Sequence, residues 1–310
     1  MKQARLLLLL LITSLTHISC KRYNRHGLPF GDVKGIHFTE VSRKFNTGLV
    51  FDKQGYQLEP VWQIKFIADD SVNVYSPKMK RYYGFHVYYD HDQIFNMIDS
   101  WLVLRALTPD SLVFQALRVN SQRQILVDDE GSNVFMTFYS DQYLKKKDPE
   151  KVKKMGLPGV RDTAYIRNRS KQVNSIPDSA FSAREPALLK SNSPYVIVEK
   201  VKSDSVSKFQ VEPVDPAQDY LFPEYNITIH KAYEDFAYSF SAFVDEKGGI
   251  RFRKSIIPYS QEFAAKYEQI IKAIIDGYVK RYVDVKPGST LSIPHKSIIL
   301  INLTGKKASS

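Results

Sequence analysis

Residues 62–74, WQIKFIADDSVNV, and residues 101–114, WLVLRALTPDSLVF, share one pattern that determines the expected fold of the first half of the chain. Each begins with a tryptophan, alternates apolar and polar residues, passes through a polar turn containing Asp-Ser, and ends in a second short alternating run. Alternation with a period of two places one set of side chains on one face of a strand. In the second copy, Pro109 presets φ for the turn and Asp110 can hydrogen-bond back to the backbone. The two stretches therefore predict two β-hairpins.

Further strands are predicted at 82–89, 124–127 and 133–139, with a turn at 128–132 and a short helical turn at 93–99. The chain is 43% hydrophobic and 13% aromatic, which excludes a disordered chain and favours β structure. Many short strands are typical of an antiparallel barrel or sandwich. The tryptophan-led strand followed by Asp-Ser-Leu-Val-Phe resembles lipocalin-like domains of secreted Bacteroidetes proteins. This resemblance implies a barrel whose mouth binds a small apolar ligand, and the alternative is an aromatic interior that fills itself.

A third hairpin is predicted in the C-terminal part of the chain. Residues 236–244, FAYSFSAFV, alternate aromatic and small side chains as a strand does. The following DEKGG, at 245–249, tolerates positive φ in a turn, and residues 250–257 return as the partner strand.

A helix and a last strand are expected after this hairpin. Ser260 can cap the helix by accepting hydrogen bonds from its first N–H groups. Residues 291–303, after a Pro-Gly turn, read as the last strand. The helix buries one stripe of residues at three-to-four spacing: Phe263, Tyr267, Ile270, Ile271, Ile274, Ile275, Tyr278 and Tyr282.

This order of elements, with the strings DEKGGI and PGSTLSIPHKSIILINL, resembles the C-terminal domain of TonB-type energy transducers over residues 222–307. The resemblance implies a small ββαβ domain that captures an extended peptide by strand addition. Because the sequence shows neither an inner-membrane helix nor a long proline-rich spacer, the domain is expected to act as a binding module only. A protected or dimeric sheet edge is the alternative. The candidate edge residues lie in the last strand: Lys296, Ser297, Ile298, Ile299, Leu300 and Ile301.

The N-terminus predicts export. A short basic segment precedes an apolar run, residues 6–15, which is too short to span a bilayer and is followed by Cys20, the only cysteine. The arrangement resembles a bacterial lipoprotein signal, with His17 where the family usually has leucine. It implies removal of residues 1–19, lipid attachment at Cys20, and, since no acidic residue follows the cysteine, an outer-membrane location facing the periplasm. Ordinary secretion and a retained anchor helix are the alternatives.

Charge and composition suggest the division of the chain. The net charge of +11 falls to about +9 once the leader is removed, because the leader contains two of the 44 basic residues and none of the 33 acidic ones. An exported protein meets anionic lipid and glycan first, so nucleic acid is not expected as a partner. The predicted parts are a leader (1–19), an antiparallel β domain (20–144), a basic connecting region rich in Pro and Ser (145–194) and an α+β domain (195–307). Candidate contacts to an anionic surface are Lys145, Lys146, Lys147, Lys151, Lys153 and Lys154.

Residues able to take part in chemistry are few. His86, Asp90 and Asp92 would share one face of a strand and are weak metal candidates, but a polar outer face explains them as well, and no metal or cofactor is expected. His295 has no carboxylate or hydroxyl partner at a catalytic spacing, and no phosphate loop or zinc-protease motif occurs. The sequence predicts a non-enzymatic envelope lipoprotein of class α+β that binds an outer-membrane protein or peptidoglycan. A lipocalin-like carrier and an envelope hydrolase are the alternatives.

Overall fold

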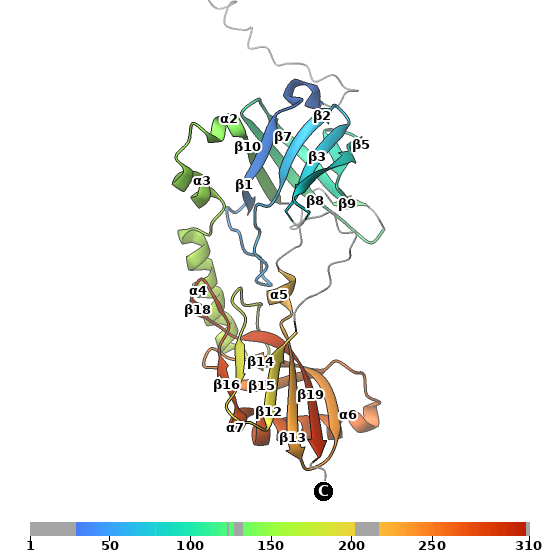
Figure 1. Ribbon diagram of the computed structural model, residues 1–310, viewed down its shortest axis with the longest axis vertical. Helices are drawn as coiled ribbons and strands as arrows, with labels where there is room; N and C mark the ends of the chain where they lie inside the picture. Colours follow the sequence, from blue (N-terminus) through green and yellow to red (C-terminus); the bar gives the residue numbers. More distant parts are fainter. Residues whose placement is uncertain (1–28, 78, 123, 127–132, 202–216, 308–310) are drawn as a thin grey trace, which may run out of the picture.

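The chain forms two large sheets at opposite ends of an elongated molecule, and helix α4 (Val160–Ser175) lies beside the region between them (Figure 1). Two further sheets of two strands each, β11-β16 and β17-β18, lie outside these two. The computed structural model describes residues 29–77, 79–122, 124–126, 133–201 and 217–307.

The first sheet is antiparallel throughout and runs in the order β4-β3-β2-β1-β10-β8-β7-β6-β5, with β9 paired to β8. Its two outer strands, β4 and β5, are consecutive in the chain and are joined only by Val87. Because one short crossing connects the two ends of the sheet, the sheet is a nearly closed barrel. The strands are β1 (His37–Phe45), β2 (Gln63–Ala68), β3 (Ser71–Ser76), β4 (Arg81–His86), β5 (Tyr88–Tyr89), β6 (Ile94–Met97), β7 (Ser100–Leu107), β8 (Ser111–Val119), β9 (Ile125–Leu126) and β10 (Val134–Ser140).

Both predicted hairpins of the first half are confirmed, as β2–β3 and β7–β8. The single strand predicted at 82–89 is wrong, because the chain leaves β3 at Val87 and continues beside β6. The helical turn predicted at 93–99 is also wrong. These residues form β6 and a tight turn in which Ile98 and Asp99 both have φ of 54°, as a two-residue hairpin requires. An apolar run of four residues does not distinguish helix from strand.

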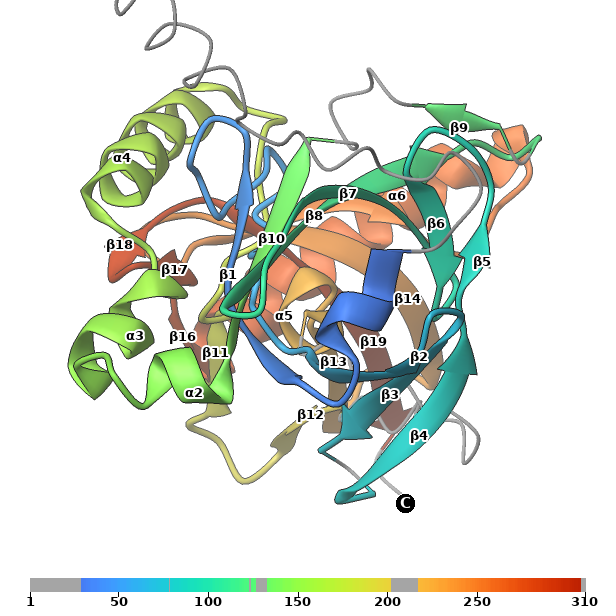
Figure 2. The same ribbon diagram turned by 90° about the horizontal axis from the view of Figure 1, so that it is seen from above.

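The barrel interior is filled at one end by the 3₁₀ helix η1 (Pro29–Val33), which lies within the ring of strands (Figure 2). Phe30 is fully buried, and its ring stacks on Phe66 at 4.0 Å between centroids. Phe95 and Phe114 approach the same ring at 5.3 and 6.3 Å. Aromatic burial of this kind contributes roughly 0.5–1.5 kcal/mol per ring pair beyond area alone. At this end the protein's own side chains fill the barrel interior.

The connecting region at 145–194 is folded rather than irregular. It contains α3 (Pro149–Met155) and α4, which follow the short helix α2 (Asp141–Leu144). Helix α4 buries Asp162, Ile166, Ser170 and Val173, spaced four, four and three residues apart on one face. Two of these four residues are polar, so the apolar periodicity that would have predicted the helix is missing.

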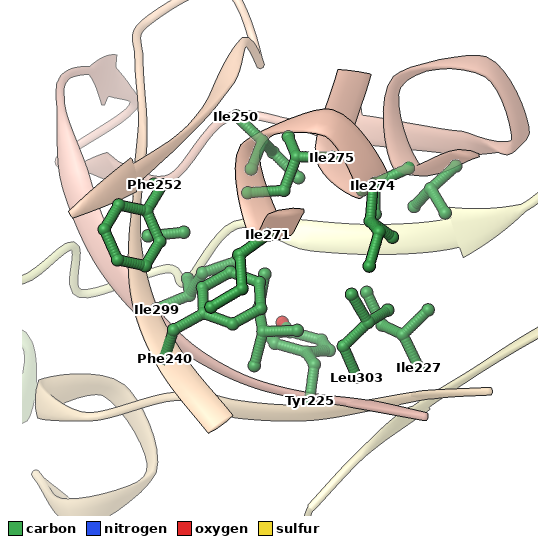
Figure 3. Close-up of a cluster of buried hydrophobic side chains, with 14 of the residues drawn as sticks. Tyr225, Ile227, Phe240, Ile250, Phe252, Ile271, Ile274, Ile275, Ile299 and Leu303 are labelled. Atoms are coloured by element: carbon green, nitrogen blue, oxygen red, sulfur yellow. The ribbon is translucent and has the colours of Figure 1, made fainter. Parts of the chain in front are cut away.

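The second sheet has the order β12-β13-β19-β14-β15, with β13 and β19 parallel and the other pairs antiparallel. Helix α6 and its π-helical continuation η3 cover one face, where Phe240, Ile271 and Ile299 are fully buried (Figure 3). The elements are β11 (Leu188–Ser191), β12 (Val196–Lys200), α5 (Gln218–Leu221), β13 (Glu224–Ala232), β14 (Phe236–Val244), β15 (Ile250–Ser255), α6 (Gln261–Ile274), η3 (Ile275–Val279), α7 (Lys280–Tyr282), β16 (Val283–Lys286), β17 (Ser289–Thr290), β18 (Ile293–Pro294) and β19 (Ser297–Lys307).

The predicted hairpin, helix and closing strand occur in order as β14, β15, α6 and β19, so the mixed α+β class is confirmed. The predicted strand edge is wrong. Strand β19 lies between β13 and β14, and the edges of this sheet are β12 and β15. Both sides of β19 are hydrogen-bonded over residues 300–305, which leaves no ladder groups there for an added strand. Strand β13 was not predicted, and its pairing removes the free edge.

Candidate ligand-binding site at the barrel mouth

The end of the barrel opposite η1 adjoins a cavity of about 670 Å³. Its wall is built from the ends of three strands, the β1–β2 connection and helix α4, through residues such as Phe45 of β1, Arg118 of β8 and Tyr165 of α4. Volumes of this size are typical of sites for small molecules. The structure therefore places a hollow large enough for a small molecule at the mouth of the barrel.

The β1–β2 connection has its own local structure. Phe51 and Gln57 form an isolated antiparallel bridge, and the N–H of Leu58 donates to the carbonyl of Val50 at 2.8 Å. At the tip, Asp52 Oδ1 accepts from the N–H groups of Gln54 and Tyr56, both at 2.8 Å. Aspartate closes such turns because its short side chain reaches the backbone two residues on. This hairpin presents one side to the cavity and the other to the second domain.

The chemistry of the wall is mixed. Phe45, Leu49 and Phe51 supply apolar surface, whereas Lys53 and Arg118 supply positive charge. Burial raises the pKa of the Asp52 carboxyl, against its hydrogen bonds from backbone N–H groups. The pKa of the Tyr165 phenol is raised, first by burial, so this hydroxyl stays protonated near neutral pH. An apolar wall beside two cations suits a ligand with an apolar body and an anionic group.

Helix α4 is held against this wall by polar contacts. The carboxylate of Asp162 accepts from the N–H of Val50 and from the N–H of Gly159, each at 2.8 Å. The Nη2 of Arg169 donates to the carbonyl of Lys53 at 3.2 Å. Asp162 is buried and satisfied, so it orders both the start of α4 and the base of the hairpin.

The same hairpin contacts the segment that follows α4 and a tyrosine of helix α5. Arg184 donates to Gln57 Oε1 at 3.0 Å and to Glu59 Oε1 at 2.8 Å, and its guanidinium lies over the ring of Tyr220. A shared apolar cluster continues the contact, built from Val50, Phe51, Ile166, Val173 and Phe181 with Tyr165, Leu291 and Ile293 packed against it. The cavity wall is thus continuous with the core between the two sheets.

Lys296, predicted at a strand edge, instead caps α4. Its Nζ donates to the carbonyls of Ile176 at 2.7 Å and Val173 at 3.0 Å, and its side chain is largely buried. A positive charge is favourable at a helix C-terminus, where carbonyls lack partners. His295 beside it stacks on Phe181 with 3.6 Å between ring centroids. His295 Nδ1 lies 3.2 Å from the Lys296 carbonyl, which can only accept, so Nδ1 carries the proton and Nε2 accepts from Thr290 Oγ1 at 3.0 Å.

The buried His295 makes stability depend on pH. Burial lowers the pKa of His295 from 6.5 to about 4, so below pH 6.5 the unfolded chain binds a proton that the folded chain does not. We expect about 2 kcal/mol of unfolding free energy to be lost between pH 7 and pH 5 through this residue. Urea titrations at the two pH values would measure the loss. The variant His295→Phe should lose about 2 kcal/mol less over the same interval, and an unchanged pH slope would contradict the assignment.

The other predicted site residues are not brought together. His86 faces Asp70 with 3.9 Å between Nδ1 and Oδ2, whereas Asp90 pairs with His91 at 2.5 Å. Within the described part of the chain, no group of three or more His, Cys, Asp or Glu side chains is placed to hold a metal ion. The lysines predicted to contact an anionic surface lie on or beside α2 and α3 and are exposed: Lys145, Lys146, Lys147, Lys151, Lys153 and Lys154.

The predicted leader, residues 1–19, and the predicted lipid attachment at Cys20 lie outside the described residues. Among the helices that the structure describes, none combines the length and the apolar character needed to cross a membrane.

Fold and site together define a nearly closed antiparallel barrel, filled at one end and hollowed at its mouth, that is packed on an α+β domain. The chain is similar in structure to a siderocalin, Ex-FABP, which is described as functioning through dual ligand specificities. The likeness covers 46% of this chain and 84% of that chain, with 14% identity and a TM-score of 0.21. No protein-family profile matches the chain, and no curated protein is similar to it.

Sequence reasoning missed the residues of the cavity. Phe45, Phe51 and Arg118 lie in three different elements, and Tyr165 lies in a helix that was not predicted. The only local signal is Asp52 in the string FDKQGY, which is typical of a turn and indicates nothing about a ligand.

Proposed function

We propose that this protein binds a small ligand with an apolar body and an anionic group in the cavity at the barrel mouth, and that it acts by binding rather than by catalysis. The observation that carries the proposal is one cavity that joins the aromatic side chains of Phe45, Phe51 and Tyr165 to the cations of Lys53 and Arg118. Burial of the apolar body supplies affinity, and the cations orient the anionic group.

The filled barrel interior supports this placement of the ligand. Phe30 and its aromatic neighbours occupy the η1 end, and the cavity lies at the opposite end. There the β1–β2 hairpin and α4 extend the wall beyond the strand ends. The proposal is a form of the lipocalin-like alternative in which the binding site is shifted outward from the barrel interior.

Fluorescence titration with 11-(dansylamino)undecanoic acid tests the proposal. We expect saturable binding, and Arg118→Gln should weaken it roughly tenfold, which corresponds to about 1.4 kcal/mol. The variant Arg118→Lys, which keeps the charge, should retain most of the affinity. The methyl ester of the same probe should bind the Arg118→Gln variant and the unaltered chain equally, since the ester lacks the anionic group.

The matched control is Arg167→Gln, which removes an exposed cation of helix α4 that does not line the cavity. Its affinity for the acid should be unchanged. Binding that does not saturate, or that both arginine variants weaken equally, would contradict a specific site at the barrel mouth.

We further infer that the protein is held at the cell envelope by a lipid on Cys20, with both domains facing the periplasm, where a partner protein or peptidoglycan is within reach. The lipoprotein-like leader and the TonB-like order of β14, β15, α6 and β19 support this second part of the proposal. Metabolic labelling with an alkyne fatty acid in a bacterial host would detect the lipid. Its loss in Cys20→Ser is expected, and equal labelling of both chains would refute the anchor.

A further inference from the structure

A continuous strip of aromatic rings runs over one end of the C-terminal domain. Its members come from the β13–β14 turn, from β14, from the β15–α6 connection and from the first turns of α6. Successive ring centroids lie 4.2 to 6.5 Å apart along the strip. The aromatic strip consists of Tyr233, Phe236, Tyr238, Tyr259, Phe263 and Tyr267.

The strip is exposed at its two ends, and at the α6 end this is because α6 meets the sheet only with its second half. Ile271 and Ile274 are buried against the sheet, whereas Phe263 in the first turn is 48% exposed. Tyr233, at the other end of the strip, is 52% exposed. Phe236 anchors the strip, since its ring packs directly on the backbone of Gly305, where a Cβ would lie 2.3 Å from the ring. The strip is thus anchored by a buried ring, and its two ends are about half exposed.

The strip carries hydroxyl groups and negative charge. Four of its six members are tyrosines, so its surface offers phenol donors and acceptors beside the ring faces. Glu234 lies next to Tyr233 in the turn. The pKa values of Tyr233 and Tyr238 are raised first by burial and then by the nearby Glu234 carboxylate. A carboxylate at the strip disfavours an anionic membrane surface.

These features match the chemistry of a sugar chain. A β-1,4-linked hexose chain is a flat ribbon that presents C–H groups on its faces and hydroxyl or amide N–H groups along its edges. Its faces can stack on aromatic rings, while its edge donors can bond to phenol oxygens and to a carboxylate. This match depends on the aromatic rings, the tyrosine hydroxyls and the Glu234 carboxylate together.

We propose that the aromatic strip binds a neutral or N-acetylated β-1,4-linked glycan, with sugar rings stacked on its two half-exposed end members, Phe263 and Tyr233, and a sugar donor bonded to Glu234. This site is separate from the cavity at the barrel mouth and does not depend on the function proposed for that cavity.

Calorimetric titration of the full chain with tetra-N-acetylchitotetraose and with cellotetraose tests the inference. Saturable binding of at least one tetrasaccharide is expected. The double variant Tyr233→Ala, Phe263→Ala removes two half-exposed rings and should weaken binding at least about tenfold, and Glu234→Gln should weaken it about threefold. The matched control, Phe222→Ala, removes a side chain that is 69% exposed outside the strip and should leave affinity unchanged.

Two further measurements separate the competing outcomes. The urea midpoint of unfolding should be the same in the double variant and in Phe222→Ala, which shows that the fold is intact. Flotation with phosphatidylglycerol vesicles should show no loss of binding in the double variant. The inference is overturned if neither tetrasaccharide binds saturably, if the double variant binds as well as Phe222→Ala, or if the double variant loses vesicle binding instead.

Discussion

Replacing Gly55 with alanine is expected to lower the free energy of unfolding by at least about 4 kcal/mol, a loss that only a few mechanisms produce. Gly55 has φ of +87°, and a Cβ there would lie 2.2 Å from the carbonyl oxygen of Ser182 in the second half of the chain. The left-handed conformation alone costs about 1–2 kcal/mol for a residue with a Cβ. The remainder comes from forcing apart two backbones, neither of which can yield as a flexible side chain would.

Gly35→Ala is the matched control. Gly35 has φ of +80° but nothing within 4 Å of the added Cβ. The free energy of unfolding of Gly35→Ala should therefore fall only by the cost of the left-handed conformation, about 1–2 kcal/mol. Urea denaturation of both variants measures the difference. Similar losses at the two positions would contradict the close approach of the barrel hairpin to the second domain.

Replacing Lys296 with methionine is expected to cost about 1–3 kcal/mol for each buried carbonyl that is left without a donor. Methionine keeps most of the side-chain volume but donates no hydrogen bonds, so the carbonyls of Val173 and Ile176 lose their donor. Because these carbonyls end α4, the last turn of that helix should fray and the apolar cluster around Phe181 should loosen.

The control for this prediction is Lys306→Met, at an exposed position of the same strand, β19, which should change stability by less than about 0.5 kcal/mol. Hydrogen exchange gives an independent measurement. We expect faster exchange of the α4 amides in Lys296→Met but not in the control. A loss below about 1 kcal/mol would show that the carbonyls of Val173 and Ile176 are satisfied in another way.

Much of the local structure could be predicted because its signals are local. The hairpins β2–β3, β7–β8 and β14–β15 each have alternating strands and a turn whose residues suit its geometry. Helix α6 has one apolar stripe, so its period was evident. These signals depend on residues no more than about eight positions apart, and no tertiary contact overrides them.

The candidate site could not be predicted in the same way. Phe51 and Tyr165 line one cavity although more than a hundred residues separate them, and Asp162 bonds to Val50 over a sequence distance of 112. The wrong edge assignment has the same origin. Residues 296–301 were assigned to a sheet edge because strand β13 was not predicted. The sequence near a strand does not show which other strands will pair with it on each side.

The sequence by itself determined the β-rich character of the first half, the hairpin-helix-strand order of the C-terminal third and the amphipathic face of α6, because propensity, turn chemistry and periodicity act between near neighbours. Only the tertiary structure decided that Phe30 fills the barrel, that β19 is central and that Lys296 caps α4. It also placed the open cavity at the mouth and the aromatic strip on the surface. Each of these depends on which surfaces remain after distant elements have packed, and burial of apolar area and satisfaction of buried polar groups are properties of the whole chain.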